Sequence, residues 1–224
     1  NISNSTIEDF VILRKDKSPT YQLSATVDDH EMNITHVIRG DDHMINSFKQ
    51  KQIYDAMGWE VPNFAHIPLI HSEQGKKLSK RDNASTLEDY VKIGIISDAL
   101  RNYLLRLGWS HGDDEIITRE DALKWFDFDK VGQSASQFDI SKLDNINGIY
   151  IRNLDDDHLV KMVLKELEKR PNLILNSKTA QRIKTGIKGL KQRVKTLTEL
   201  GGANMLTVQA FDSKSIEASL DDKN

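Results

Sequence analysis

The chain has 224 residues, of which 38% are hydrophobic and 29% are charged, as is usual for a globular protein. Its 31 basic and 34 acidic residues give a net charge of only −3, so overall charge does not indicate binding to nucleic acid or membranes. The absence of cysteine excludes a disulfide framework and a Cys-based zinc site, and no apolar run reaches the ~18 residues of a membrane span, so we expect a cytoplasmic protein without a zinc site.

The first part of the chain reads as alternating strands and one helix. We expect strands over 10–13, 20–27, 36–39 and 65–70, where apolar and β-branched residues cluster. A helix is expected from about Asp42 to Met57, since acidic residues suit its positive N-terminal end and Gly58 suits the position after its end. A strand, a helix and a strand in this order predict a parallel sheet.

The chain after Ser85 has helical patterns throughout. The spacing Ser85-x-x-Glu88 is typical of a capping box and predicts a helix start. Four further patterns predict helices: Leu100, Tyr103, Leu104 and Leu107; Thr118-x-x-Asp121; Leu159, Met162, Val163 and Leu167; and the stripe Ile183, Ile187, Leu190, Val194 and Leu197.

A basic loop joins the two parts, reading GKKLSKRD from Gly75. A solvated basic turn is the usual explanation of such a cluster. This cluster, however, follows an expected parallel strand, and ligands of such sheets bind beyond the carboxyl ends of the strands. Lys77, Ser79 and Lys80 are close enough in sequence to converge on one anion, so we interpret the loop as a phosphate clamp.

The loop also carries a resemblance to a known family. The segment Lys77-Leu78-Ser79-Lys80-Arg81 resembles the KMSKS-type signature of class I aminoacyl-tRNA synthetases, in the form typical of glutamyl-tRNA synthetases of the bacterial type. An ordered series of other segments agrees: SPTYQL from Ser18, THVIRGDDH from Thr35, YLLRLGWS from Tyr103 and FDISKL from Phe138. The match is nearly continuous from Phe10 to Arg152.

The resemblance implies a fold and an activity. It implies an α/β part over 1–84, the second half of a Rossmann-type nucleotide fold, then a helical stem-contact-type domain over 85–152 and the start of a helical anticodon-binding domain over 153–224. It also implies ATP-dependent activation of L-glutamate to glutamyl-adenylate and transfer to tRNA-Glu, with ATP as substrate, Mg²⁺ as cofactor and a monomeric enzyme.

Site residues follow from the matching motifs. Tyr21 and Arg39 match the glutamate-binding residues, and a planar guanidinium suits a carboxylate. The resemblance gives a catalytic role to Lys77, Ser79 and Lys80, and ATP binding to Asp42, His43, Leu69, Lys77, Lys80 and Arg81. Simpler structural roles stay open for several of them: capping for Asp42 and His43, an ion pair for Arg39, and strand packing for Tyr21. His66 is expected to serve ordinary packing or to lie at the surface, and no metal site is expected.

The last helix is rich in basic residues. Lys188, Lys191 and Arg193 are candidates for contact with tRNA phosphates, and a solvated helix face is the alternative.

None of the seven histidines lies in the His-x-Gly-His signature of class I synthetases, so we expect a fragment that lacks the N-terminal part and is inactive alone. Two alternatives stay open: an enzyme that also charges tRNA-Gln, and a non-catalytic tRNA-binding remnant.

Overall fold

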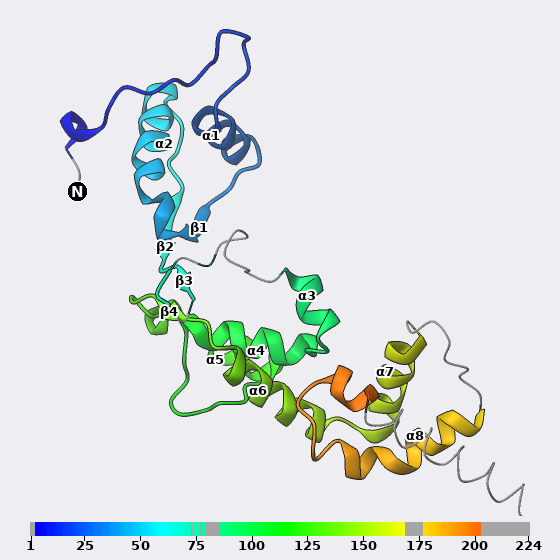
Figure 1. Cartoon of the computed structure of the whole chain (residues 1–224). Helices are drawn as coiled ribbons and strands as arrows, with labels where there is room; N and C mark the ends of the chain where they lie inside the picture. The colour runs from blue at the N-terminus through cyan, green and yellow to red at the C-terminus, as the bar shows by residue number, and fades with distance from the viewer. Residues whose placement is uncertain (1–2, 73, 77, 79–85, 169–176, 203–224) are drawn as a thin grey trace, which may run out of the picture. The chain divides into compact units, whose positions relative to one another are not determined.

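The computed structural model describes residues 3–72, 74–76, 78, 86–168 and 177–202 (Figure 1). The chain forms two compact units. The first contains residues 1–71 and 131–136, and the second contains 72–130 and 137–224. The expected fold class, an α/β part followed by a mostly helical part, is confirmed.

The first unit is built on one parallel β–α–β unit. Strand β1 (His36–Gly40) leads through a 3-10 turn, η2 (Asp41–His43), into helix α2 (Met44–Met57), and strand β2 (Asn63–Ile67) follows. The strands are parallel, with Arg39 opposite His66 and Gly40 opposite Ile67. Gly58 ends α2 with a left-handed φ of 67°, as its position predicted.

Two strand predictions in this unit are wrong. Residues 21–31 form helix α1 (Tyr21–Glu31), which contacts α2. The β-branched Thr26, which favoured a strand, is buried within α1 and donates its hydroxyl proton to the carbonyl of Gln22 at 2.8 Å. Residues 11–13 are exposed, Phe10 is half-buried, and this segment forms a single bridge from Leu13 to Pro19.

The expected strand over 65–70 is divided in the structure. Strand β2 ends at Ile67, and a separate short strand, β3 (Ile70–His71), follows Pro68. Proline has no N–H to give to a sheet, so a break is expected there. Strand β3 pairs with β4 (Ser136–Gln137) in a second two-stranded sheet. A short 3-10 turn, η1 (Asn4–Thr6), precedes all these elements.

The second unit is helical. Its elements are α3 (Leu87–Lys92), α4 (Ser97–Gly108), α5 (Arg119–Trp125), η4 (Phe128–Lys130), α6 (Ile140–Asn153), α7 (Asp156–Glu168) and α8 (Ser177–Leu190). The helix start predicted from Thr118-x-x-Asp121 is confirmed, and the Thr118 hydroxyl caps α5 by accepting from the Asp121 N–H at 3.1 Å. The capping box of α3 lies one residue later than predicted: Asp89 accepts from the Thr86 N–H at 2.9 Å.

One hydrophobic core joins α3, α4, α6, α7 and α8. Its buried side chains come from both halves of the unit, including Tyr103, Leu143, Leu159, Ile187 and Leu200. The expected division into 85–152 and 153–224 stays a prediction, but residues from both ranges share this core.

The apolar stripe from Ile183 to Leu197 is not one continuous helix. Helix α8 ends at Leu190, yet Val194 and Leu197 remain buried in the core beyond the following turn.

Candidate active site

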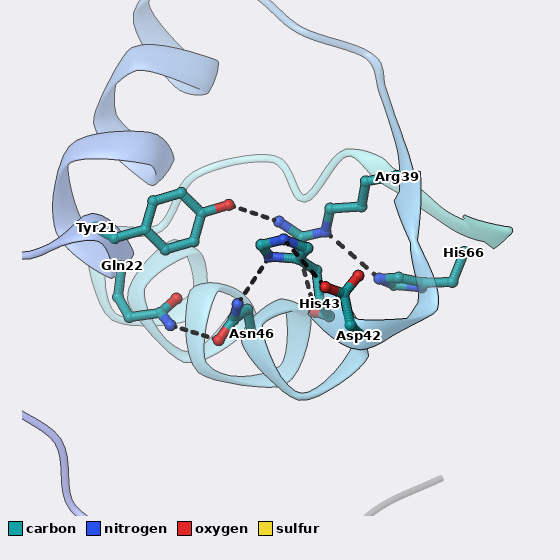
Figure 2. Close-up of polar contacts among 7 residues, drawn as sticks. All are labelled: Tyr21, Gln22, Arg39, Asp42, His43, Asn46 and His66. Atoms are coloured by element: carbon teal, nitrogen blue, oxygen red, sulfur yellow. Dashed lines mark hydrogen bonds and ion pairs between the residues drawn. The ribbon is translucent and has the colours of Figure 1, made fainter. Parts of the chain in front are cut away.

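A polar cluster occupies the carboxyl ends of the two parallel strands in the first unit (Figure 2). Arg39 is the second-last residue of β1, and the strand register places His66 of β2 opposite it. Tyr21 comes from the first turn of α1, and His43 from η2. Parallel strands end at one edge of a sheet, so sequence positions far apart converge here.

Arg39 is the centre of this cluster. Its Nη1 donates to the Tyr21 hydroxyl at 3.2 Å, and its Nη2 donates to Gln50 Oε1 at 2.9 Å and to the His43 carbonyl at 3.4 Å. Its Nε donates to His66 Nε2 at 3.5 Å. These contacts fix the plane of the guanidinium.

The hydrogen bonds leave a defined set of donors for a ligand. A guanidinium has five N–H groups, and both protons of Nη2 and the single proton of Nε have partners here. One Nη1 proton has no partner among the residues that the structure describes. The Tyr21 hydroxyl, which accepts from Nη1, keeps its own proton to donate. An Nη1 proton and a phenol proton side by side suit the two oxygens of a carboxylate.

His66 is held as a neutral acceptor. Burial lowers its pKa, and the positive charge of Arg39 lowers it further. A neutral imidazole can accept from the Arg39 Nε–H, whereas an imidazolium cannot. The expectation that His66 serves only ordinary packing is therefore too simple.

A second polar chain connects α1 with the start of α2. Gln22 Nε2 donates to Asn46 Oδ1 at 2.7 Å, and Asn46 Nδ2 lies 3.1 Å from His43 Nδ1. The rings of Tyr21 and His43 have centroids 6.1 Å apart. The imidazole of His43 is therefore held against the same aromatic side chain that contacts Arg39.

Gly40 lets two predicted ATP-binding residues approach the cluster. A Cβ atom at Gly40 would lie 2.7 Å from Asp42 Oδ1 and 2.9 Å from Leu69 Cδ2, both too close. Asp42, His43 and Leu69 thus gather at the edge of the sheet where Arg39 lies.

The clamp residues Lys77, Ser79, Lys80 and Arg81 lie outside the described residues. The chain leading to them makes a tight turn, with the Ser72 N–H donating to the Lys76 carbonyl at 2.7 Å.

The basic residues of the second unit divide into two groups. Lys191 is buried, and its ammonium donates to the Leu154 carbonyl at 2.9 Å and pairs with Asp156 at 2.6 Å. Lys184 pairs with Asp157 at 2.7 Å, so α7 supplies the opposing charge that the sequence pattern did not reveal. Lys188 and Arg193 are exposed.

Sequence reasoning missed two parts of the Arg39 cluster, Gln50 and Asn46. Neither belongs to a recognisable motif. The signal that could have found Gln50 is geometric, because Gln50 lies on the helix that directly follows β1 and η2.

Within the described parts of the chain, no three His, Asp or Glu residues are grouped to hold a metal ion. No helix among those residues is long and apolar enough to cross a membrane.

A parallel β–α–β unit with charged and polar side chains at its carboxyl edge defines a ligand-binding α/β nucleotide-type fold. Residues 1–145 match the model of the catalytic domain of class I tRNA synthetases for E and Q. The chain belongs to this family, and the resemblance seen in its motifs is confirmed.

Individual relatives agree. The chain is 50% identical to glutamate–tRNA ligase 2 of Paramagnetospirillum magneticum and 52% identical to glutamate–tRNA ligase of Pelagibacter ubique, in each case over 99% of the chain. It covers 47% and 48% of those proteins, so it spans about half their length. The crystal structure of a glutamate tRNA ligase from Elizabethkingia meningosepticum, in complex with its amino acid, matches 90% of the chain and 43% of its own with a TM-score of 0.75 and 31% identity.

Proposed function

We propose that this chain forms part of a glutamate–tRNA ligase that activates L-glutamate with ATP and transfers it to tRNA-Glu. The observation that carries the proposal is the pair formed by Arg39 Nη1 and the Tyr21 hydroxyl, 3.2 Å apart at the carboxyl edge of the sheet. Membership of the family and the names of the relatives support it. A charging enzyme that also accepts tRNA-Gln stays an alternative.

In this proposal Arg39 and Tyr21 bind the side-chain carboxylate of glutamate. The carboxylate takes one hydrogen bond from Nη1 and one from the phenol. Charge-assisted bonds of this kind are about twice as strong as neutral ones. Glutamine would offer one oxygen to one of these donors, and its N–H₂ group would face the other donor, which disfavours it.

The reaction requires neutralisation of charge on the phosphates of ATP. We assign this role to Lys77 and Lys80, with Ser79 as a hydroxyl donor and Arg81 beside them. Asp42, His43 and Leu69 would contact the adenosine. The described residues offer no three-ligand metal group, so Mg²⁺ would be held chiefly by phosphate oxygens and water.

The second unit would contact tRNA. We assign phosphate contacts to Lys188 and Arg193, which are exposed, and a structural role to Lys191, whose ammonium is already bonded to Leu154 and Asp156. The enzyme would act as a cytoplasmic monomer.

ATP–pyrophosphate exchange by the full-length protein tests the reaction. We expect glutamate to support exchange and Lys80→Ala to reduce kcat by roughly 100-fold or more, since one preorganised donor is worth about 3–4 kcal/mol in a transition state. The KM for glutamate should change little. Lys76→Ala, which removes an exposed cation from the same loop, is the matched control. Exchange at the normal rate by Lys80→Ala would overturn the assignment.

A further inference from the structure

We propose that Gln50 is a positioning residue that fixes the guanidinium of Arg39 for glutamate binding. The inference rests on the proposed function, because the fixed guanidinium matters only if it receives the substrate carboxylate. Gln50 lies on α2 and is 1% exposed, and its Oε1 accepts from Arg39 Nη2 at 2.9 Å. This is the shortest of the four hydrogen bonds that Arg39 donates within the described parts of the chain.

The orientation of the Gln50 amide is determined by this contact. If the amide were flipped, its N–H₂ group would face the N–H₂ of the guanidinium, and two donors would oppose each other. The carbonyl oxygen must therefore point toward Arg39. With Nη2 occupied by Gln50 and by the His43 carbonyl, Nη1 is the terminal nitrogen that turns toward Tyr21.

Keeping an amide at this position has a cost. Gln50 Nε2 is buried and has no hydrogen-bond partner within the part of the chain that the structure describes. A buried donor without a partner opposes folding, and an apolar side chain of similar size would avoid that penalty. Gln50 therefore lowers folding stability locally while it holds Arg39 in the site, and this combination is typical of a residue kept for function.

The neutrality of Gln50 is the second part of the argument. A glutamate at this position would also accept from Nη2, but its negative charge would compensate the positive charge of Arg39. The hydrogen-bond partners of Arg39 among the described residues are an amide, a phenol, a carbonyl and an imidazole whose pKa is lowered, and the ring centroid of Phe64 lies 5.4 Å from its guanidinium carbon. The carboxylate of Asp29 acts on Arg39 only through space, since Arg39 lowers the pKa of Asp29. The neutral hydrogen-bond partners hold the guanidinium in place without a carboxylate bonded to it, so its bonding capacity stays directed at the substrate.

A double-mutant cycle in the full-length protein tests this role. We expect Gln50→Met to raise the KM for glutamate in ATP–pyrophosphate exchange by roughly 10-fold, the effect of losing one hydrogen bond to a charged group. The kcat and the KM for ATP should stay within about 2-fold. In an Arg39→Lys background, Gln50→Met should add no more than about 2-fold, because Gln50 acts through the guanidinium. Gln52→Met, on the same helix, is the matched control.

The outcomes separate the two proposals. An equal cost of Gln50→Met in both backgrounds would overturn the positioning role and leave the proposed function intact. An unchanged KM for glutamate in Arg39→Lys alone would overturn the glutamate assignment, and the positioning role with it.

A second variant keeps the test valid if Gln50→Met does not fold. Gln50→Glu keeps the size and the acceptor, so it should preserve the melting temperature. It should still raise the KM for glutamate by at least roughly 10-fold, because it compensates the charge of Arg39. A normal KM in this variant would show that only the fold needs Gln50, and would overturn the proposal.

Discussion

Asn147 offers a sharp test of how the helical unit is held together. Its side chain on α6 is fully buried, and Oδ1 accepts from the Ile96 N–H at 2.8 Å. Nδ2 donates to the Gly94 carbonyl at 3.2 Å and to the Lys195 carbonyl at 2.7 Å. One amide thus joins the loop after α3, helix α6 and the turn after α8. We expect Asn147→Ala to break all three bonds.

The cost can be worked out bond by bond. The buried N–H of Ile96 loses its partner, which costs about 1–3 kcal/mol. The Gly94 carbonyl keeps a second donor, the Leu197 N–H at 2.9 Å, so its loss is small. Lys195 is exposed and water can reach its surroundings, so its carbonyl contributes about 1 kcal/mol. We expect a total of roughly 2–4 kcal/mol.

Urea unfolding of the chain measures this cost. Trp109 is buried in the helical unit and reports its unfolding, and Trp59→Phe removes the tryptophan signal of the first unit. Asn145→Ala is the matched control, since Asn145 is exposed on the same helix and shares the change in helix propensity. If Asn147→Ala lowered the free energy of unfolding by no more than Asn145→Ala, within about 0.5 kcal/mol, the account of this junction would be wrong.

Three further predictions concern single positions. Gly94→Ala should cost more than about 3 kcal/mol, because the φ of Gly94 is 86° and a Cβ there would lie 2.5 Å from a backbone nitrogen. Gly112→Ala, at a φ of 54° with open space around it, should cost about 1 kcal/mol, and similar urea midpoints for the two variants would refute the clash. Hydrogen bonds from Lys92 and Thr86 lower the pKa of Asp89 to about 2, so the carboxylate of Asp89 should stabilise α3 above pH 4 and lose this effect as the pH falls toward 2. An Asp89→Asn variant whose stability depends on acid pH in the same way as the parent's would contradict this. Burial lowers the pKa of His66, so below pH 6.5 the unfolded state binds more protons than the folded state, and the free energy of unfolding should rise with pH through that window. His66→Gln should flatten this rise. An unchanged slope of the free energy of unfolding against pH, measured by urea titration, would contradict the prediction.

The parallel β–α–β unit could be predicted because its signals are local. Gly58 marks the end of α2, and the short β-branched run that begins at His36 marks β1. Helix α1 could not be predicted in this way. Its threonine, valine and tyrosine favour a strand, and its helical form depends on contact with α2, which sequence periodicity does not report.

The site was predictable only in part. Arg39 and Tyr21 could be identified from the motifs around them, and the structure brings them within hydrogen-bond distance. Gln50 and His66 could not, because their roles depend on strand register and on the burial of α2. The burial of Lys191 was hidden for a similar reason, since its partner Asp156 is distant in sequence.

The most direct test of the account is the KM for glutamate in ATP–pyrophosphate exchange by the full-length protein carrying Arg39→Gln. Losing charge-assisted bonds to the substrate carboxylate should raise this KM by roughly 10- to 150-fold, while the KM for ATP stays unchanged. Arg14→Gln, which changes an exposed arginine of the first unit, should leave both values as they were. A normal KM for glutamate in Arg39→Gln would contradict the claim that Arg39 binds the substrate.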